Sequence, residues 1–121
     1  MTKILVVDDE FLVADMVTCL LEDEGYEVAQ AAHGRQALAM IKAERPGLII
    51  TDFMMPLMTG LELAETLKSL PEYRDLPIVL MSGAQGAIAR DRHDLFAAVF
   101  DKPFQNGRLL ETVRELIGTA L

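Results

Sequence analysis

The chain has 121 residues, of which 51% are hydrophobic and 25% charged, a balance typical of one globular domain rather than of a disordered segment. Its 19 Asp and Glu residues exceed its 11 Lys and Arg residues, which gives a formal net charge of −8. Eight of the acids and none of these bases lie between Ile4 and Gly34. An acidic domain without a basic stripe argues against nucleic acid or an anionic membrane as a direct partner.

Several other classes of protein are excluded by short stretches of sequence. The first apolar run ends at Asp8, so it is no signal peptide, and no apolar stretch is long enough to span a bilayer. The single Cys19 allows neither an intramolecular disulfide nor a cysteine-based metal site. Because it lies in a helical apolar pattern, we expect a buried thiol. These features together predict a cytoplasmic protein.

The first half of the chain alternates strand and helix patterns. A buried strand over Ile4–Val7 precedes a helix at about Phe11–Glu24, with Leu12, Met16, Cys19 and Leu20 predicted on its inner face. A weaker strand, Tyr26–Ala31, contains Glu27 and belongs near an edge of the sheet. A helix over Arg35–Arg45 ends at Pro46.

The second half continues the same alternation. Buried strands are predicted over Leu48–Ile50, Ile78–Met81 and Ala97–Phe100. A helix over Gly60–Leu70 begins with a Thr59–Glu62 capping box, and another spans about Asn106–Ile117. A less regular helix is expected within Gln85–Phe96. The β-α order, repeated five times, predicts a single α/β domain over residues 1–121, with a parallel sheet covered by helices on both faces.

Polar side chains follow four of the predicted strands, where the strands end. Asp8 and Asp9 follow the first strand, Asp52 the third, Ser82 the fourth and Lys102 the fifth. Because the carboxyl ends of parallel strands share one edge of the sheet, three carboxylates, a hydroxyl and an ammonium group converge there. Each has a structural alternative, such as a helix cap, a turn or a solvated lysine, but all of these would have to coincide.

The charges at this edge predict a metal site. Three carboxylates and one lysine sum to −2, and carboxylates at close range repel one another. A hard cation held by a few oxygen ligands, with room for water, fits Mg²⁺. With Mg²⁺ and Lys102 the site can hold an incoming phosphoryl group, and a carboxylate there can act as the nucleophile and become an aspartyl phosphate.

From Lys3 to Ile117 the sequence resembles a known family, the receiver (response-regulator) domain of two-component signalling. The similar stretches are Ile4–Glu10, Leu21–Tyr26, Asp52–Gly60, Met81–Gly83 and Lys102–Phe104. The resemblance implies a doubly wound, five-stranded parallel sheet of the flavodoxin-like kind, with strand order 2-1-3-4-5 and five helices.

The resemblance also implies a role for each polar residue. Asp52 would be the phosphoacceptor; Asp9, Asp52 and the backbone carbonyl of Met54 would bind Mg²⁺, with Asp8 assisting through water. Lys102 would pair with the phosphoryl group, Ser82 would hydrogen-bond it, and the Lys102–Pro103 peptide would be cis.

The partners follow from the same resemblance. The phosphodonor would be a phosphohistidine on a histidine kinase or a histidine phosphotransfer protein, and a downstream protein would read the signal. The receiver would catalyse only its own phosphorylation and dephosphorylation, as a monomer or a weak phosphorylation-dependent dimer. The acidic first helix, beside the active edge, is where a donor with a basic surface would dock, although a solvated helix face explains the same charges.

One position departs from the family. Val99 occupies the place of the usual switching Tyr or Phe, and strand alternation sends the adjacent Phe100 to the opposite face. Val is stiff at χ1 and cannot swing between a buried and an exposed position as an aromatic ring can. We therefore expect activation to be read out through backbone movement of the loop after Ser82, or through the fourth helix.

Three alternative functions stay open. The chain could be a receiver-like interaction module that never accepts phosphate, as Val99 suggests, or a small Mg²⁺-dependent phosphatase with an aspartate nucleophile. Phosphatases of the haloacid-dehalogenase type have their nucleophile in an Asp-x-Asp arrangement after the first strand, whereas Asp8 and Asp9 are adjacent in this chain. A flavin or nucleotide carrier is disfavoured because neither glycine-rich phosphate-binding motif occurs.

Overall fold

A computed structural model describes residues 3–83, 91–92 and 94–119 of the chain. The elements alternate as predicted: β1 (Lys3–Val7), α1 (Phe11–Asp23), β2 (Glu27–Ala31), α2 (Gly34–Ala43), β3 (Leu48–Asp52), α3 (Gly60–Ser69), η1 (Pro71–Tyr73), β4 (Ile78–Ser82), β5 (Ala98–Asp101) and α5 (Asn106–Ile117). All strand pairs are parallel and the strand order is β2-β1-β3-β4-β5, which confirms the predicted doubly wound sheet.

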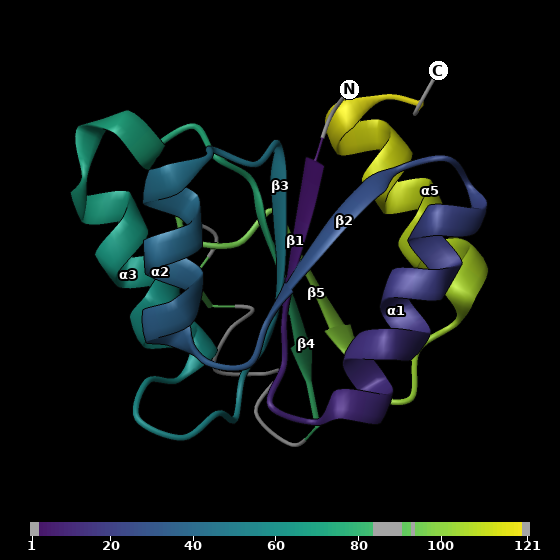
Figure 1. The fold of residues 1–121 in the computed structure, drawn as a ribbon, viewed down its shortest axis with the longest axis horizontal. Helices are drawn as coiled ribbons and strands as arrows, with labels where there is room; N and C mark the ends of the chain where they lie inside the picture. Colours follow the sequence, from purple (N-terminus) through teal and green to yellow (C-terminus); the bar gives the residue numbers. More distant parts are fainter. Residues whose placement is uncertain (1–2, 84–90, 93, 120–121) are drawn as a thin grey trace.

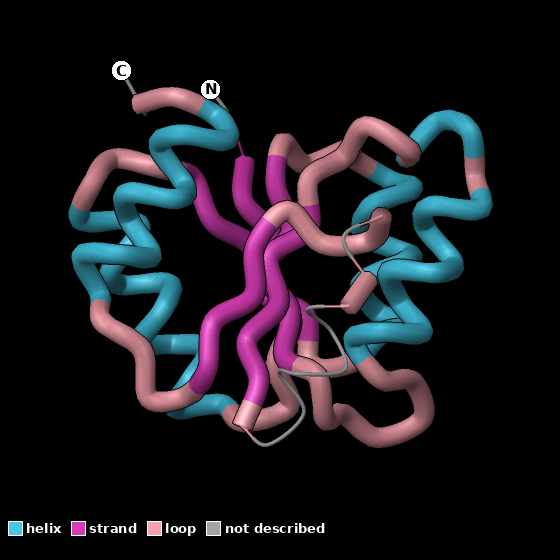
Figure 2. The backbone as a smooth tube through the Cα atoms, turned by 180° about the vertical axis from the view of Figure 1, so that it is seen from behind, coloured by secondary structure: helices cyan, strands magenta, loops and turns pink. Residues whose placement is uncertain are grey.

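The sheet forms the middle layer of three (Figure 1). Helices α2 and α3 cover one face, and α1 and α5 cover the other. The same two pairs of helices flank the strands in the view from behind (Figure 2). Each face has its own apolar cluster. Leu5, Ile49 and Leu80 pack with Leu63 of α3, whereas Ile4, Ile50 and Met81 pack with Val17 of α1.

Strands β3 and β4 are buried along their whole length, as the apolar runs predicted. Strand β5 lies at an edge of the sheet, and its residues are half-buried or exposed. The expectation that Ala97–Phe100 is buried on both faces is therefore wrong: among the described residues this edge strand pairs with β4 alone, and less of its surface is covered than in β3 and β4. Strand β2 forms the other edge, which confirms the placement of the Glu27 strand.

Helix α1 has the predicted position but presents a different face to the core. Its buried residues are Ala14, Val17 and Leu21. Leu12 is 81% exposed and Met16 is 50% exposed, and the Cys19 thiol is also on the surface rather than buried. Of the four residues predicted on the inner face, Leu20 does pack against the apolar cluster that contains Val17, whereas the prediction is wrong for Leu12, Met16 and Cys19. The helix carries apolar residues nearly all round, so two stripes fit the helical period equally well.

Among the described residues there are four α-helices and one short 3-10 helix. The fourth helix expected within Gln85–Phe96 falls mainly on residues outside the described part, and residues 91, 94 and 95 form turns. The 3-10 helix Pro71–Tyr73 was not predicted. Within the described ranges, no helix has both the length and the apolar character required to cross a membrane.

Candidate functional site

The register of the sheet brings the predicted site residues into one row at the carboxyl ends of the strands. Val7 pairs with Thr51, so that Asp8 and Asp52, one residue further along each strand, become neighbours. Asp52 pairs with Met81, the residue before Ser82. Ser82 in turn pairs with Asp101, the residue before Lys102. This edge lies at the bottom of the molecule in Figure 1.

Asp52 is the central carboxylate of the row. It is only 4% exposed, and its Oδ1 lies 3.0 Å from the Nζ of Lys102. Burial raises the pKa of Asp52, and the hydrogen bond and charge of Lys102 oppose that shift without cancelling it. The side chain is therefore a carboxylate whose negative charge the protein compensates only in part.

Asp8 is even more confined. It is 3% exposed, and its Oδ1 accepts a hydrogen bond of 2.8 Å from the backbone N–H of Glu10. Its Oδ2 has no hydrogen-bond partner among the described residues, and the Nζ of Lys102 is 3.7 Å away. Burial raises the pKa of Asp8 to about 6, and the charge of Asp52 adds to the effect. A buried, partnerless carboxylate oxygen is costly unless a cation joins it.

Lys102 and Ser82 are held together by the backbone. The N–H of Lys102 donates a 2.7 Å hydrogen bond to the carbonyl oxygen of Ser82, which ends β4 and is fully buried. The Lys102–Pro103 peptide is cis, as the resemblance implied. Partial burial lowers the pKa of Lys102, but the hydrogen bond and charge of Asp52 and the charges of Asp8 and Glu10 outweigh it and raise the pKa. The lysine is therefore positively charged in this site.

Asp9 and Met54 lie beside this group. Asp9 is exposed and lines a groove with Phe11 and Gln30, although its charge still raises the pKa of Asp52. Met54 lies two residues beyond Asp52, in the loop before α3, and its side chain is 57% exposed. Their roles as Mg²⁺ ligands stay predictions.

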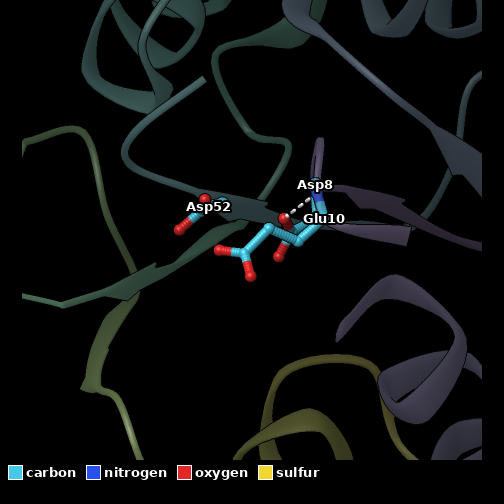
Figure 3. Close-up of side chains that lie close together, drawn as sticks. All are labelled: Asp8, Glu10 and Asp52. Carbon is cyan, nitrogen blue, oxygen red and sulfur yellow. Dashed lines mark hydrogen bonds between the residues drawn. The ribbon is translucent and has the colours of Figure 1, made fainter. Parts of the chain in front are cut away.

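The structure adds Glu10, which had no place in the predicted site. Within the described residues, one carboxylate oxygen from each of Asp8, Glu10 and Asp52 lies within 4.8 Å of the other two (Figure 3). The sequence offered a weak signal, because Glu10 directly follows the acidic pair. An acid at this place is also explained by the start of a helix, where acidic residues are generally favourable.

The position of the usual aromatic switch is as the sequence predicted. Val99 packs in the apolar cluster that contains α2 and α3, whereas Phe100 packs in the cluster on the other face. The ring of Phe100 lies 6.0 Å from that of Phe104, centroid to centroid. Strand alternation therefore separates Phe100 from the face that carries Val99.

The donor set fits Mg²⁺. The three clustered carboxylates are hard oxygen ligands, and with Lys102 they sum to −2. Three carboxylates against one lysine leave the group with more negative charge than the protein neutralises, and the Oδ2 of Asp8 accepts no hydrogen bond from the described residues. Burial, which raises the pKa values of Asp8 and Asp52, adds to the cost of keeping these carboxylates charged. A divalent cation removes that excess.

Comparisons with known proteins point to one family. The family model described as the response regulator receiver domain matches residues 4–114. The polar-differentiation response regulator DivK of Brucella anthropi is 30% identical over 120 residues, which cover 98% of each chain. The response regulator MprA of Mycolicibacterium vanbaalenii is 36% identical over 118 residues, 95% of this chain but 50% of that protein.

A solved structure agrees with these relatives. The chemotaxis protein CheY4 of Vibrio cholerae superposes with a TM-score of 0.87 at 34% identity, covering 96% of this chain and 98% of its own. The fold, the strand order and the matched sequence all lead to the same assignment. The chain belongs to the response regulator receiver domain family.

Proposed function

We propose that residues 1–121 form one receiver domain that takes a phosphoryl group from a phosphohistidine onto Asp52, with Mg²⁺, and switches or relays to a partner protein. The observation that carries this proposal is the buried Asp52 carboxylate, 3.0 Å from Lys102 and beside an oxygen of Asp8 that accepts no hydrogen bond from the described residues. A nucleophile (Asp52) and a cation (Lys102) lie together in one site, and the carboxylates of that site carry more negative charge than Lys102 neutralises. Phosphoryl transfer requires this combination.

The transfer step is a displacement at phosphorus. A carboxylate oxygen of Asp52 forms the new O–P bond while the N–P bond of the phosphohistidine breaks, and the electron pair of that bond stays on the imidazole nitrogen. Lys102 already lies against Asp52, so its ammonium group is placed to pair with the oxygens of the incoming group. Ser82, at the end of the neighbouring strand, supplies a hydroxyl at the same edge.

The metal belongs to the acidic side of the site. Asp8, Asp9, Asp52 and the backbone carbonyl of Met54 are the proposed Mg²⁺ ligands. When bound, Mg²⁺ neutralises the carboxylates and stabilises negative charge on the phosphoryl oxygens. The buried Oδ2 of Asp8, which accepts no hydrogen bond from the described residues and has the Nζ of Lys102 3.7 Å away, would then gain a second cation. The protein would catalyse only its own phosphorylation and dephosphorylation.

The protein would act in the cytoplasm, and its phosphodonor would be a histidine kinase or a histidine phosphotransfer protein. The exposed side of α1 adds an apolar element to the acidic surface proposed as the docking site. Phe11 is 70% exposed and Leu12 81%, and both follow directly after the acidic residues of the site. An apolar contact surrounded by acids suits a donor whose surface combines apolar and basic residues.

The proposal is tested by labelling with acetyl phosphate and Mg²⁺, followed by intact-mass spectrometry. We expect the wild type to gain one phosphoryl group, and Asp52→Ala and Asp52→Asn to gain none. The matched control is Asp23→Asn, which removes an exposed acid at the end of α1 and should label normally.

Full labelling of Asp52→Ala would overturn the assignment of the phosphoacceptor, and labelling of the wild type in the presence of a chelator would overturn the metal requirement. A wild type that never takes up phosphate would favour the phosphate-independent interaction module. Transfer from a phosphorylated kinase at low and high ionic strength checks the docking surface, since a rate that does not change with salt contradicts electrostatic docking.

A further inference from the structure

Glu10 lies at the start of a helix, but its side chain does not cap that helix. It is the N-cap residue of α1, with φ −89° and ψ 102°, yet its side chain makes no capping hydrogen bond. The N-caps of α2 and α3 behave differently, because His33 accepts from the N–H of Gln36 and Thr59 accepts from the N–H of Glu62. The carboxylate of Glu10 is therefore not used to begin its helix.

That carboxylate points instead toward the site. Figure 3 shows the side chain of Glu10 reaching past Asp8 toward Asp52, while its backbone N–H donates to Asp8. Its oxygen lies within 4.8 Å of oxygens of both aspartates. Asp8 and Asp52 are buried, whereas Glu10 is exposed, so Glu10 forms the solvent side of the cluster.

A second observation indicates that this cluster is meant for a cation. The Oδ2 atom of Asp8 is buried and accepts no hydrogen bond from the described residues. Lys102 is the cation that the described structure places against both aspartates, and one ammonium group leaves three carboxylates at −2. Placing Glu10 there makes the repulsion worse unless positive charge is added.

We propose that Glu10 is an additional residue of the Mg²⁺ site, contributing its charge and its carboxylate oxygens from the solvent side and so raising the affinity for the metal. This inference rests on the proposed function. It extends the ligand set implied by the resemblance, in which Asp9 and not Glu10 accompanies Asp8. Mg²⁺ keeps several of its waters, so an exposed carboxylate beside the ligands can accept hydrogen bonds from them.

The inference is tested by isothermal titration calorimetry with Mg²⁺ alone, without any phosphodonor. Glu10→Gln keeps the size of the side chain and removes its charge, and we expect it to weaken binding about tenfold. Glu22→Gln makes the same charge change at an exposed position near the other end of α1, and should change the affinity by less than about twofold. Circular dichroism spectra confirm that each variant is folded.

A third variant separates position from charge. Glu10→Asp keeps the negative charge but shortens the side chain by one methylene, so we expect binding weaker than in the wild type. Wild-type affinity in Glu10→Asp would overturn the claim that the oxygens of Glu10 reach the metal site. Equal affinities of Glu10→Gln and Glu22→Gln would overturn the inference while leaving the proposed function intact, whereas a wild type that binds no Mg²⁺ would overturn both.

Discussion

Helices α1 and α3 begin at the same edge of the sheet, but their first turns are built differently. Helix α3 begins with a reciprocal capping box, in which Thr59 and Glu62 each accept a backbone N–H from the other. Helix α1 begins without any side-chain cap, and the acid at its N-cap, Glu10, lies in the carboxylate cluster. An acidic residue serves the fold at the start of α3 and the candidate metal site at the start of α1.

The difference shows where the protein gives up stability. At the start of α3, the side chains of Thr59 and Glu62 each accept a hydrogen bond from a backbone N–H, so the polar groups of the first turn are satisfied. At α1 three carboxylates lie close together, one of their buried oxygens accepts no hydrogen bond from the described residues, and the helix N-terminus lacks a side-chain cap. Proteins often tolerate such local costs where a ligand resolves them. Four substitutions test whether the two starts differ in this way.

The largest effect is expected at the start of α3. A Cβ added at Gly60 would lie 2.4 Å from the backbone oxygen of Asp52 and 2.9 Å from the side chain of Leu80. Because buried backbone must move to make room, we expect Gly60→Ala to lower the free energy of unfolding by roughly 3 kcal/mol or more. The measurement is urea unfolding followed by circular dichroism.

The matched control for this substitution is Gly107→Ala in α5, where an added Cβ meets nothing within 4 Å. Alanine is the better helix former there, so stability should rise by about 0.5 to 1 kcal/mol. If Gly60→Ala were as stable as the wild type, the claim that the start of α3 is tightly packed against β3 and β4 would be wrong.

The next effect concerns the start of α1, where the substitution should raise the free energy of unfolding rather than lower it. Asp8→Asn removes a buried charge and keeps the shape that accepts the N–H of Glu10. Since burial raises the pKa of Asp8 to about 6, ionising it destabilises the folded state. At about 1.4 kcal/mol per pKa unit, the variant should gain up to about 3 kcal/mol at neutral pH without Mg²⁺.

The pH dependence of this gain follows from the same shift. The folded protein holds the proton of Asp8 more tightly than the unfolded chain does, so wild-type stability from this group falls as pH rises from about 4 to about 6. The gain of Asp8→Asn over the wild type should grow across that window and stay constant above it. Saturating Mg²⁺ should shrink the gain, and a gain that does not depend on pH would contradict the charge argument.

The smallest effects exchange the two kinds of helix start. Thr59→Ala removes the cap of α3 and should cost about 1 kcal/mol, whereas Glu10→Ser gives α1 a good cap and should add about 0.5 kcal/mol without Mg²⁺. Thermal unfolding of both variants at one pH provides the measurement. Two changes of the same sign would remove the contrast between the helices.

Much of this architecture could be predicted because buried parallel strands leave a clear pattern. The strands around Ile49 and Val79 were found within two residues, and the last helix was placed at Asn106–Ile117. The convergence of Asp8, Asp52 and Lys102 followed from the strand ends alone, because parallel strands end at the same edge.

Other features depend on information that a pattern does not hold. The inner face of α1 could not be chosen, since Leu12 and Met16 repeat with the same period as the buried Ala14, Val17 and Leu21. Glu10 was missed because its role depends on the direction of one side chain. An acid at a helix start looks the same in sequence whether it caps the helix or turns away from it.

The backbone hydrogen bond from Lys102 to Ser82 has a mechanical consequence. It bonds the amide of the lysine to the end of β4, so the two residues proposed to hold the phosphoryl group are connected directly through their backbones. This 2.7 Å hydrogen bond follows the last pair of the β4–β5 ladder, Ser82 with Asp101, and so extends the connection between the two strands as far as Lys102. Because Lys102 also pairs with Asp52, its side chain contacts the proposed phosphoacceptor while its backbone is bonded to the end of β4, so the lysine connects the site to the edge strand β5 through the main chain.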